Sequence, residues 1–159
     1  MGDISFRNMT DVEYEKFVET SVLDYSQNLI KSGECSEENG FECAENQFKE
    51  LLPQGKYTED NFFCVVVNDE NENVGVIWYR KHTEGIAFIT DFLIYKQFRK
   101  KGYGRATLLL LDSEAKAKGY NKILLHVFKF NETAFSLYSS LGYKVVEEKS
   151  DGLYMVKEI

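Results

Sequence analysis

The sequence predicts one α+β domain spanning residues 1–159, built on a mixed but mostly antiparallel β-sheet. Its length of 159 residues suits a single domain with a full hydrophobic core. Two kinds of pattern alternate along it: β-rich apolar runs separated by polar turns, and segments whose apolar residues recur at helical spacing. Because the runs in the middle of the chain follow one another directly, they predict hairpins, whose strands run antiparallel.

The N-terminal region predicts a short strand followed by a long helix. Residues 4–7 alternate between apolar and polar side chains. Thr10 and Glu13 form the capping-box pattern T-x-x-E, so a helix is expected to begin near Asp11. One apolar face of this helix is expected to pack on the sheet through Tyr14, Phe17, Val18, Val22, Tyr25 and Leu29.

The remaining elements follow from the same two patterns. Residues 31–40 are glycine-bearing and acidic, which predicts an exposed loop, and a second helix is expected from Phe41 to Leu52, ended by Pro53 and Gly55. Strands are expected at 62–67, 74–80, 86–95, 122–128, 143–147 and 153–157, and further helices at 105–118 and 131–141. The predicted order is therefore β-α-α-β-β-β-α-β-α-β-β.

The turn from Gln97 to Gly104 is basic and carries two glycines between a strand and a helix. Gly102 and Gly104 lack Cβ atoms, so a ligand can approach the backbone, and the first N–H groups of the following helix have no intrahelical acceptor. These groups and the helix dipole favour a phosphate. The cationic side chains around this point suit a diphosphate better than a single carboxylate; they are Arg99, Lys100, Lys101 and Arg105. The alternative is an ordinary strand-to-helix connection with a solvated basic face.

Two known phosphate-binding motifs do not fit this turn. A P-loop requires Lys-Ser or Lys-Thr after its second glycine, whereas Arg105 and Ala106 follow Gly104. A dinucleotide fingerprint requires a third glycine where Thr107 stands and an acidic residue at the end of the next strand, where residues 126–128 are His-Val-Phe. A nucleotide-phosphate enzyme on a doubly wound sheet is also disfavoured, because hairpins rather than β-α-β units precede the turn.

The remaining pattern, Arg99-x-x-Gly102-x-Gly104 after a strand, resembles the acetyl-CoA-binding signature of the GNAT family of N-acetyltransferases. One strand later, a string similar to the family's second signature is Asn131-x-x-Ala134-x-x-Leu137-Tyr138-x-x-Leu141-Gly142-Tyr143. The resemblance implies the GNAT fold, a three-layer arrangement in which helices cover both faces of a seven-stranded sheet. It also implies an enzyme that transfers an acetyl group from acetyl-CoA to a primary amine by direct attack on the thioester.

By this resemblance, acetyl-CoA lies in a V-shaped slot between strands 86–95 and 122–128. Its pantetheine arm pairs like an extra strand with the backbone of Phe92, Leu93 and Ile94, and the N–H of Ile94 faces the thioester oxygen. The diphosphate is held by the turn, at Arg99, Lys100, Lys101, Gly102, Tyr103, Gly104 and Arg105. Asn131 either caps the helix that it precedes or hydrogen-bonds the pantetheine arm, and the two roles are compatible.

Three residues are candidates for catalysis. Tyr138 aligns with the family's general acid, and a phenol is a protonated donor at neutral pH. The general base stays open between His126, Asp91 and a water molecule. His126 stands where some family members carry a glutamate, and its imidazole accepts a proton near neutral pH. Asp91, on the neighbouring strand, either holds a cationic amine or relays its proton through water, and a purely structural role is the alternative for each of the three.

Composition limits the partners. A formal net charge of −7 argues against nucleic acid and mildly favours a cationic acceptor. No apolar run is long enough to cross a bilayer and residues 1–7 lack the pattern of an export signal, so we expect a cytoplasmic protein with no membrane partner. The spacing of Cys35, Cys43 and Cys64 suggests neither a disulfide framework nor a metal site, so we expect free thiols and no metal.

The acceptor site is expected beside the first two helices. Their acidic residues suit a cationic amine or form a solvated face; these are Glu13, Asp24, Glu34, Glu37, Glu38, Glu42, Glu45 and Glu50. Aromatic walls are expected from Tyr14, Tyr25, Phe41 and Trp78. A homodimer is compatible with the resemblance, because many family members pair through edge strands or the C-terminal hairpin. The alternative function is a non-catalytic acyl-CoA-binding sensor or interaction module, which has no need of a proton donor at Tyr138.

Overall fold

A computed structural model of the chain, which describes residues 3–150 and 152–159, contains a seven-stranded sheet. The strands follow one another across it in the order β1-β2-β3-β4-β5-β7-β6. Their bounds are β1 Ile4–Asn8, β2 Asn61–Asn68, β3 Asn73–Thr83, β4 Ile86–Ile94, β5 Lys122–Phe128, β6 Lys144–Glu148 and β7 Gly152–Glu158. Neighbouring strands pair antiparallel except β4 and β5, which run parallel. The predicted mixed, mostly antiparallel sheet is therefore confirmed.

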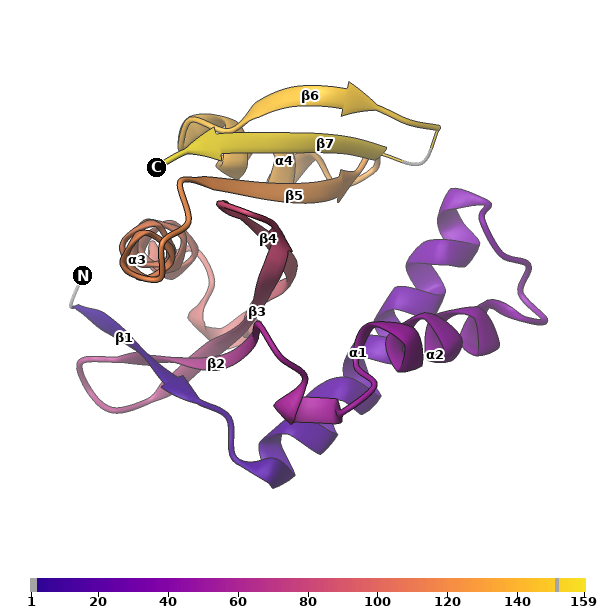
Figure 1. The fold of residues 1–159 in the computed structure, drawn as a ribbon, viewed down its shortest axis with the longest axis horizontal. Helices are drawn as coiled ribbons and strands as arrows, with labels where there is room; N and C mark the ends of the chain where they lie inside the picture. The colour runs from indigo at the N-terminus through magenta and orange to yellow at the C-terminus, as the bar shows by residue number, and fades with distance from the viewer. Residues whose placement is uncertain (1–2, 151) are drawn as a thin grey trace.

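Helices cover both faces of this sheet (Figure 1). They are α1 Asp11–Ser32, α2 Gly40–Leu51, α3 Tyr103–Ala117 and α4 Glu132–Ser140. No helix in the described part of the chain is long and apolar enough to span a bilayer. The layered arrangement implied by the resemblance is confirmed.

Strand β2 shows how one sheet serves two cores. Cys64 and Val66 belong to the core that contains residues of α3 and α4, whereas Phe63, Val65 and Val67 belong to the core beneath α1 and α2. Alternate side chains of a strand point to opposite faces, so a continuous apolar run is what a strand buried on both faces requires. The core beneath α1 and α2 is the one that borders the site described below.

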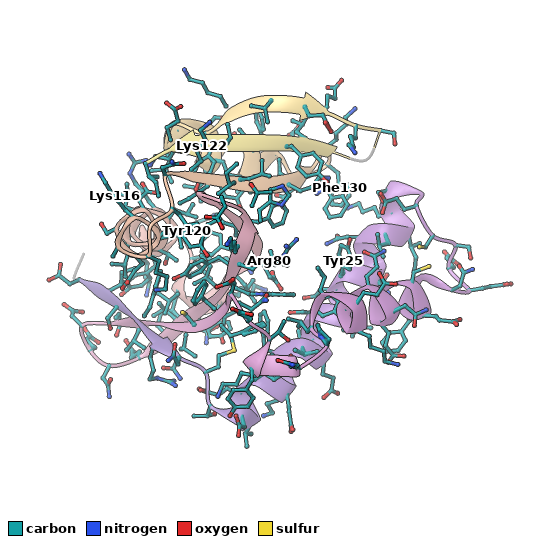
Figure 2. The ribbon with its side chains drawn as sticks, in the orientation of Figure 1. Tyr25, Arg80, Lys116, Tyr120, Lys122 and Phe130 are labelled. Atoms are coloured by element: carbon teal, nitrogen blue, oxygen red, sulfur yellow. The ribbon has the colours of Figure 1, made fainter. Side chains whose placement is uncertain are left out.

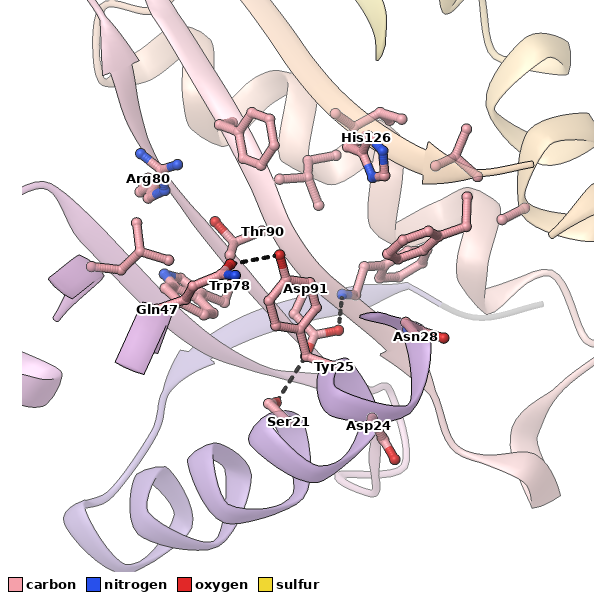
Figure 3. A pocket seen from close by; sticks show the side chains of 18 of the residues that line it. Ser21, Asp24, Tyr25, Asn28, Gln47, Trp78, Arg80, Thr90, Asp91 and His126 are labelled. Carbon is pink, nitrogen blue, oxygen red and sulfur yellow. Dashed lines mark hydrogen bonds between the residues drawn. The ribbon is translucent and has the colours of Figure 1, made fainter. Parts of the chain in front are cut away.

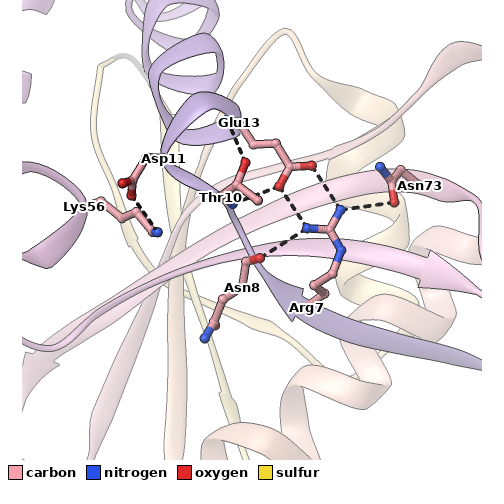
Figure 4. A network of polar contacts seen from close by, with 7 residues as sticks. All are labelled: Arg7, Asn8, Thr10, Asp11, Glu13, Lys56 and Asn73. Atoms are coloured by element: carbon pink, nitrogen blue, oxygen red, sulfur yellow. Dashed lines mark hydrogen bonds and ion pairs between the residues drawn. The ribbon is translucent and has the colours of Figure 1, made fainter.

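The start of α1 is organised as the sequence predicts (Figure 4). Thr10 Oγ1 accepts a hydrogen bond from the backbone N–H of Glu13 at 3.2 Å, and the Glu13 carboxylate accepts one from the backbone N–H of Thr10 at 2.8 Å. The same carboxylate accepts two hydrogen bonds from the Arg7 guanidinium, at 2.8 and 3.0 Å. These bonds from Arg7 lower the pKa of Glu13 to about 2 and join β1 to α1.

Two helix boundaries differ from the prediction by two residues, and the others by one residue at most. Helix α1 runs to Ser32, into the stretch expected as a loop, and ends where Gly33 takes a φ of 87°. Helix α3 begins at Tyr103 rather than Arg105, because Gly102 with a φ of 86° is its N-cap. Short 3-10 turns at Gly55–Tyr57 and Lys96–Phe98 are additional to the predicted elements, since single turns carry no periodic signal.

The three cysteines are free thiols, as expected. The fold nevertheless brings two of them together, because Cys35 follows α1 and Cys43 lies in α2. A hydrogen bond with Cys43, together with burial, raises the pKa of Cys35 to about 11. Sequence spacing alone does not indicate this pair, since the turn between the two helices creates it.

Candidate active site

The sheet opens between β4 and β5. Residues 86–89 of β4 lie opposite residues 122–125 of β5, and the pairing ends there although β4 continues to Ile94 and β5 to Phe128. The diverging strand ends therefore face a common slot. This is the position at which the resemblance implies a slot for the pantetheine arm.

A β-bulge at Thr90 marks the point where the strands separate. Trp78 of β3 lies opposite Asp91, whereas the next residue, Tyr79, lies opposite Ile89, so Thr90 has no partner residue in β3. A bulge bends its strand and re-aims the side chains that follow. The bulge therefore helps to turn β4 away from β5.

Backbone directions beyond the bulge determine what β4 offers to the slot. The N–H of Tyr95 donates a 2.9 Å hydrogen bond to the carbonyl of Val74 in β3. Because backbone groups alternate along an antiparallel strand, those of Leu93 also point to β3, while those of Phe92 and Ile94 point to the slot. The contact of the pantetheine arm with Phe92, Leu93 and Ile94 stays a prediction, and the backbone groups of Leu93 are directed to β3 rather than to the slot.

The basic turn presents a helix N-terminus that has no side-chain cap. Its N-cap is Gly102, which has no side chain to accept a hydrogen bond. The carbonyl of Gly102 accepts from the N–H of Ala106 at 3.0 Å, so the amides of Tyr103, Gly104 and Arg105 precede the helical bonding pattern. These amides point out of the positive end of α3 and suit an anion.

Four cationic residues lie in this turn and in the first turn of α3. Arg99 Nε donates a 2.8 Å hydrogen bond to the carbonyl of Ile94, which holds the side chain beside the last residue of β4. Arg99, Lys100, Lys101 and Arg105 are exposed, and Lys100 has a φ of 62°, which is uncommon for a residue with a Cβ. Oriented amides with mobile positive charge around them fit a diphosphate group.

A cavity of about 920 Å³ lies between the sheet and the helices α1 and α2 and opens toward the slot (Figure 3). Its walls come from α1, α2, β3, β4, β5, α4 and β7. The lining residues are Ser21, Asp24, Tyr25, Asn28, Glu34, Gln47, Phe48, Glu50, Leu51, Trp78, Arg80, Phe88, Ile89, Thr90, Asp91, Phe92, Leu125, His126, Val127, Phe128, Asn131, Ala134, Tyr138 and Tyr154. The fold thus brings Asp91, His126, Asn131 and Tyr138, four separately predicted residues, to one cavity.

Asp91 stands where β4, α1 and the cavity meet. Its Oδ2 accepts a 2.8 Å hydrogen bond from Ser21 Oγ, and its Oδ1 accepts one of 2.8 Å from the backbone N–H of Phe92. Burial raises the pKa of Asp91, while the hydrogen bonds from Ser21 and Phe92 oppose that change. A buried carboxyl group with a raised pKa is a stronger proton acceptor than an exposed one.

Tyr138 lies on α4 and is buried, 9% exposed. Burial, and secondly the negative charge of Asp91, raises the pKa of Tyr138 to about 12. The phenol therefore stays protonated at neutral pH, as a general acid must. Asp91 and Tyr138 line the same cavity.

His126 and Asn131 occupy the β5 side of the cavity. The His126 ring packs edge-on against Phe128 and Tyr154, with ring centroids 4.9 and 5.0 Å apart. Asn131 Oδ1 accepts a 3.2 Å hydrogen bond from the N–H of Ala134, so its capping role at α4 is confirmed. A contact between Asn131 and the pantetheine arm stays a prediction.

A contact outside the lining of the cavity joins α1 to the connection that follows β5. Lys31 Nζ, in the last turn of α1, lies 4.0 Å from the centre of the Phe130 ring, and Phe130 stacks on Phe128 with centroids 5.4 Å apart. Figure 2 shows Phe130 beside the end of α1, with Tyr25 and Arg80 around the same gap. The side chains of Lys31 and Phe130 thus connect the end of α1 to the segment that follows β5.

Some of the expected walls are found and others are not. Asp24, Glu34 and Glu50 line the cavity, as do Tyr25 and Trp78. Phe41 is 51% exposed, and Tyr14 packs edge-on against Phe63 at 4.9 Å instead. Tyr14 is in the first turn of α1, so it lies over β2 rather than over the slot. Helical spacing predicts which face of the helix a residue is on. It does not predict which strand of the sheet that residue contacts.

Several polar residues of the cavity are not among the predicted site residues, and they are Ser21, Asn28, Gln47, Arg80 and Thr90. The position of Arg80 could be inferred from the sequence, because alternation along its strand places it on the same face as Trp78. Ser21 had a weaker one, as a polar residue on the apolar side of α1. Thr90 had none, because an inserted residue breaks the alternation from which a face is inferred.

Comparison with known proteins agrees with this geometry. Residues 28–143 match the model of the acetyltransferase (GNAT) family. The chain is 34% identical over 142 residues to the uncharacterized N-acetyltransferase YdgE of Bacillus subtilis (strain 168), covering 87% of this chain and 90% of that protein. The crystal structure of YycN from Bacillus subtilis matches with a TM-score of 0.84 and 31% identity, covering 92% of this chain and 97% of that one.

The PaiA N-acetyltransferase of Thermoplasma acidophilum, solved in complex with coenzyme A, shares the fold with a TM-score of 0.72 and 21% identity over 99% of each chain. The family match and the curated relatives extend over most of the chain and agree on one kind of enzyme. The chain therefore belongs to the acetyltransferase (GNAT) family and is an acetyl-CoA-dependent acetyltransferase.

Proposed function

We propose that the protein transfers the acetyl group of acetyl-CoA to a primary amine by direct attack of the amine on the thioester, with both substrates bound together. The observation that carries this proposal is the continuity of the slot with the cavity that Asp91 and Tyr138 line. A ternary complex requires such continuity, because the nitrogen has to reach the carbonyl carbon without a covalent enzyme intermediate.

The residues of the slot fit the cosubstrate. The amides of Tyr103, Gly104 and Arg105 would bind the diphosphate, and the slot-facing backbone of Phe92 and Ile94 would pair with the pantetheine arm. The N–H of Phe92 already donates to Asp91, so Ile94 is the better candidate to face the thioester oxygen and stabilise its developing negative charge.

Two proton transfers accompany the reaction. The attacking amine has to lose a proton, and we propose that Asp91 accepts it directly or through a water, because burial raises the pKa of this carboxyl group above its usual value. The leaving thiolate has to gain a proton, and the phenol of Tyr138 would donate it. Burial raises the pKa of the Cys64 thiol to about 11, and burial in the slot would likewise raise the pKa of the CoA thiol. The pKa values of the phenol, about 12, and of the thiol would then differ less, which favours proton transfer between them. His126 stays an alternative base.

Steady-state acetylation of a panel of primary amines tests the proposal. In Tyr138→Phe we expect kcat to fall about 100-fold or more, the usual effect of losing a general acid, while the affinity for CoA stays nearly unchanged. The matched control is Tyr143→Phe, which removes a buried hydroxyl without a hydrogen-bond partner in the described chain and outside the cavity. Equal rates in Tyr138→Phe and the parent would remove this phenol from the mechanism. Absence of turnover with every amine would favour the binding module instead.

A further inference from the structure

Arg80 places a cation in the wall of the acceptor cavity. It lies on β3 opposite Phe88 of β4, and the centre of its guanidinium is 5.1 Å from the centre of the Phe88 ring. The side chain is half-buried, and its Nε is a buried atom with no hydrogen-bond acceptor among the residues that the structure describes. An arginine remains charged at neutral pH even when burial lowers its pKa, as it does here.

Thr90 supplies a second unpartnered polar group to the same cavity. It is the extra residue of the β4 bulge, and its Oγ1 is buried without a hydrogen-bond partner in the described part of the chain. Figure 3 shows Thr90 and Arg80 on the sheet wall, away from His126. Buried polar groups in native proteins are nearly always satisfied by protein, water or ligand. Both atoms are buried in the cavity wall, so a ligand that enters the cavity would complete their bonding once the two side chains rotate toward it.

The position of Arg80 separates it from the cosubstrate. Trp78 lies opposite Asp91 and is two residues before Arg80 on β3. The backbone of Arg80 is therefore roughly 6–7 Å along the strand from the residue that faces Asp91. Phe88, opposite Arg80, precedes Asp91 in β4, whereas the slot-facing Ile94 and the basic turn follow it. Arg80 is therefore on the acceptor side of Asp91, away from the phosphate-binding end of α3.

The charges of the cavity are of both signs. Asp24, Glu34 and Glu50 come from α1, α2 and their connection, and they would attract a protonated amine as it enters. Carboxylates alone would suit a polyamine. The Arg80 guanidinium would repel the second ammonium group of a polyamine, whereas it would pair with an anion in its place. A dianionic phosphate would be repelled by the acidic side chains, so a singly charged carboxylate fits better.

We propose that the acceptor is a primary amine that also carries a carboxylate, and that Arg80, together with Thr90, binds that carboxylate. This inference rests on the proposed function and names its substrate class. The planar guanidinium matches the two oxygens of a carboxylate, and the threonine hydroxyl can donate a further hydrogen bond. The amine end of the acceptor then extends toward Asp91 and the thioester.

Matched acceptors test the inference. Glycine, 4-aminobutanoate and 6-aminohexanoate are compared with the monoamine and the diamine of corresponding length. For the best-fitting length we expect kcat/KM to be at least about tenfold higher for the aminoalkanoate, as the gain of a charge-assisted hydrogen-bonded pair implies. A preference for the diamines, or no preference at any length, would overturn the proposal.

Variants of Arg80 assign the preference to this side chain. Arg80→Met keeps an unbranched stem to pack on Phe88 and removes the charge, so the ratio of kcat/KM between aminoalkanoate and monoamine should fall to near one. Arg80→Lys should retain part of that ratio. The control is Lys81→Met, because Lys81 is the next residue along the strand, points to the opposite face and pairs with Glu84. An equal loss in Lys81→Met would also contradict the proposal.

A binding measurement separates this inference from the proposed function. Calorimetry with hexanoate, which cannot be acetylated on nitrogen, reports on the carboxylate subsite in the CoA complex whether or not the protein turns over an amine. Hexanoate binding that is lost in Arg80→Met, with an unchanged melting profile, supports the subsite. Equal hexanoate affinity in the parent and in Arg80→Met would overturn the carboxylate subsite even if amines are acetylated. If hexanoate binds as expected but no amine is acetylated, the catalytic proposal is contradicted and the subsite is not.

Discussion

The hydroxyl of Ser21 donates a 2.8 Å hydrogen bond to Oδ2 of Asp91, and this contact joins α1 to the bulged part of β4. Ser21 is buried, and its hydrogen bond lowers the pKa of a carboxyl group whose pKa burial raises. We expect Ser21→Ala to raise the pKa of Asp91 further and to reduce the free energy of unfolding by about 1 kcal/mol.

The pH dependence of kcat/KM checks this expectation. If Asp91 is the general base, the acid limb of the kcat/KM profile moves to higher pH in Ser21→Ala. Ser26 is a suitable control, because its hydroxyl is buried and donates to the Leu23 carbonyl of its own helix. Ser26→Ala should change stability without moving the limb. A limb that stays in place in Ser21→Ala would argue that another group accepts the proton.

Asp91→Asn should change how stability depends on pH. At low pH the carboxyl group is protonated in both the folded and the unfolded state and has no effect. As the pH rises above the unfolded pKa of about 3.9, the unfolded state ionises first, so the parent loses stability until the folded-state group has ionised. The stability of Asp91→Asn relative to the parent should therefore increase with pH, as measured by urea denaturation. Parallel curves for parent and variant would contradict the raised pKa.

Glu13 should show the opposite sign. The hydrogen bonds from Arg7 lower its pKa to about 2, so its contribution to stability is present above the unfolded pKa of about 4.3 and is lost as the pH falls through about 2. Glu13→Gln should be less stable than the parent at neutral pH, and the difference should vanish toward pH 2. The Arg7 and Glu13 side chains are 41% and 33% exposed, so added salt should also reduce the difference. A difference independent of pH would mean that capping, and not charge, accounts for it.

Gly102→Ala should weaken CoA binding. Gly102 and Gly119 lie at opposite ends of α3 with φ values of 86° and 97°, and no atom lies within 4 Å of a Cβ added at Gly119. An alanine in this left-handed region costs roughly 1–2 kcal/mol of stability at either position. Gly119→Ala is thus a control for strain, and calorimetry should find weaker CoA binding in Gly102→Ala alone. Equal CoA affinities in the two variants would separate Gly102 from the phosphate site.

Much of the fold could be predicted because its signals are local. The capping box at Thr10 and the strand 122–128 depend on a few consecutive residues, and their observed bounds agree with the predicted ones. The boundary of α3 was missed because Gly102 caps the helix through its φ, and backbone angles are not visible in residue types. The basic turn was recognisable for the same reason as the strands, since all its residues are contiguous in the chain.

Local pattern was therefore enough to identify the elements, the phosphate-binding turn and the family. It could not identify the composition of the acceptor cavity, where Ser21 of α1 contacts Asp91 of β4 and Arg80 of β3 lines the same wall. Their arrangement depends on the extra residue at Thr90 and on the point at which β5 stops pairing with β4, and neither can be inferred from a local pattern of residues. The sequence determines which side chains are present. Which charges face one another is determined only by the packing of the helices on the two faces of the sheet.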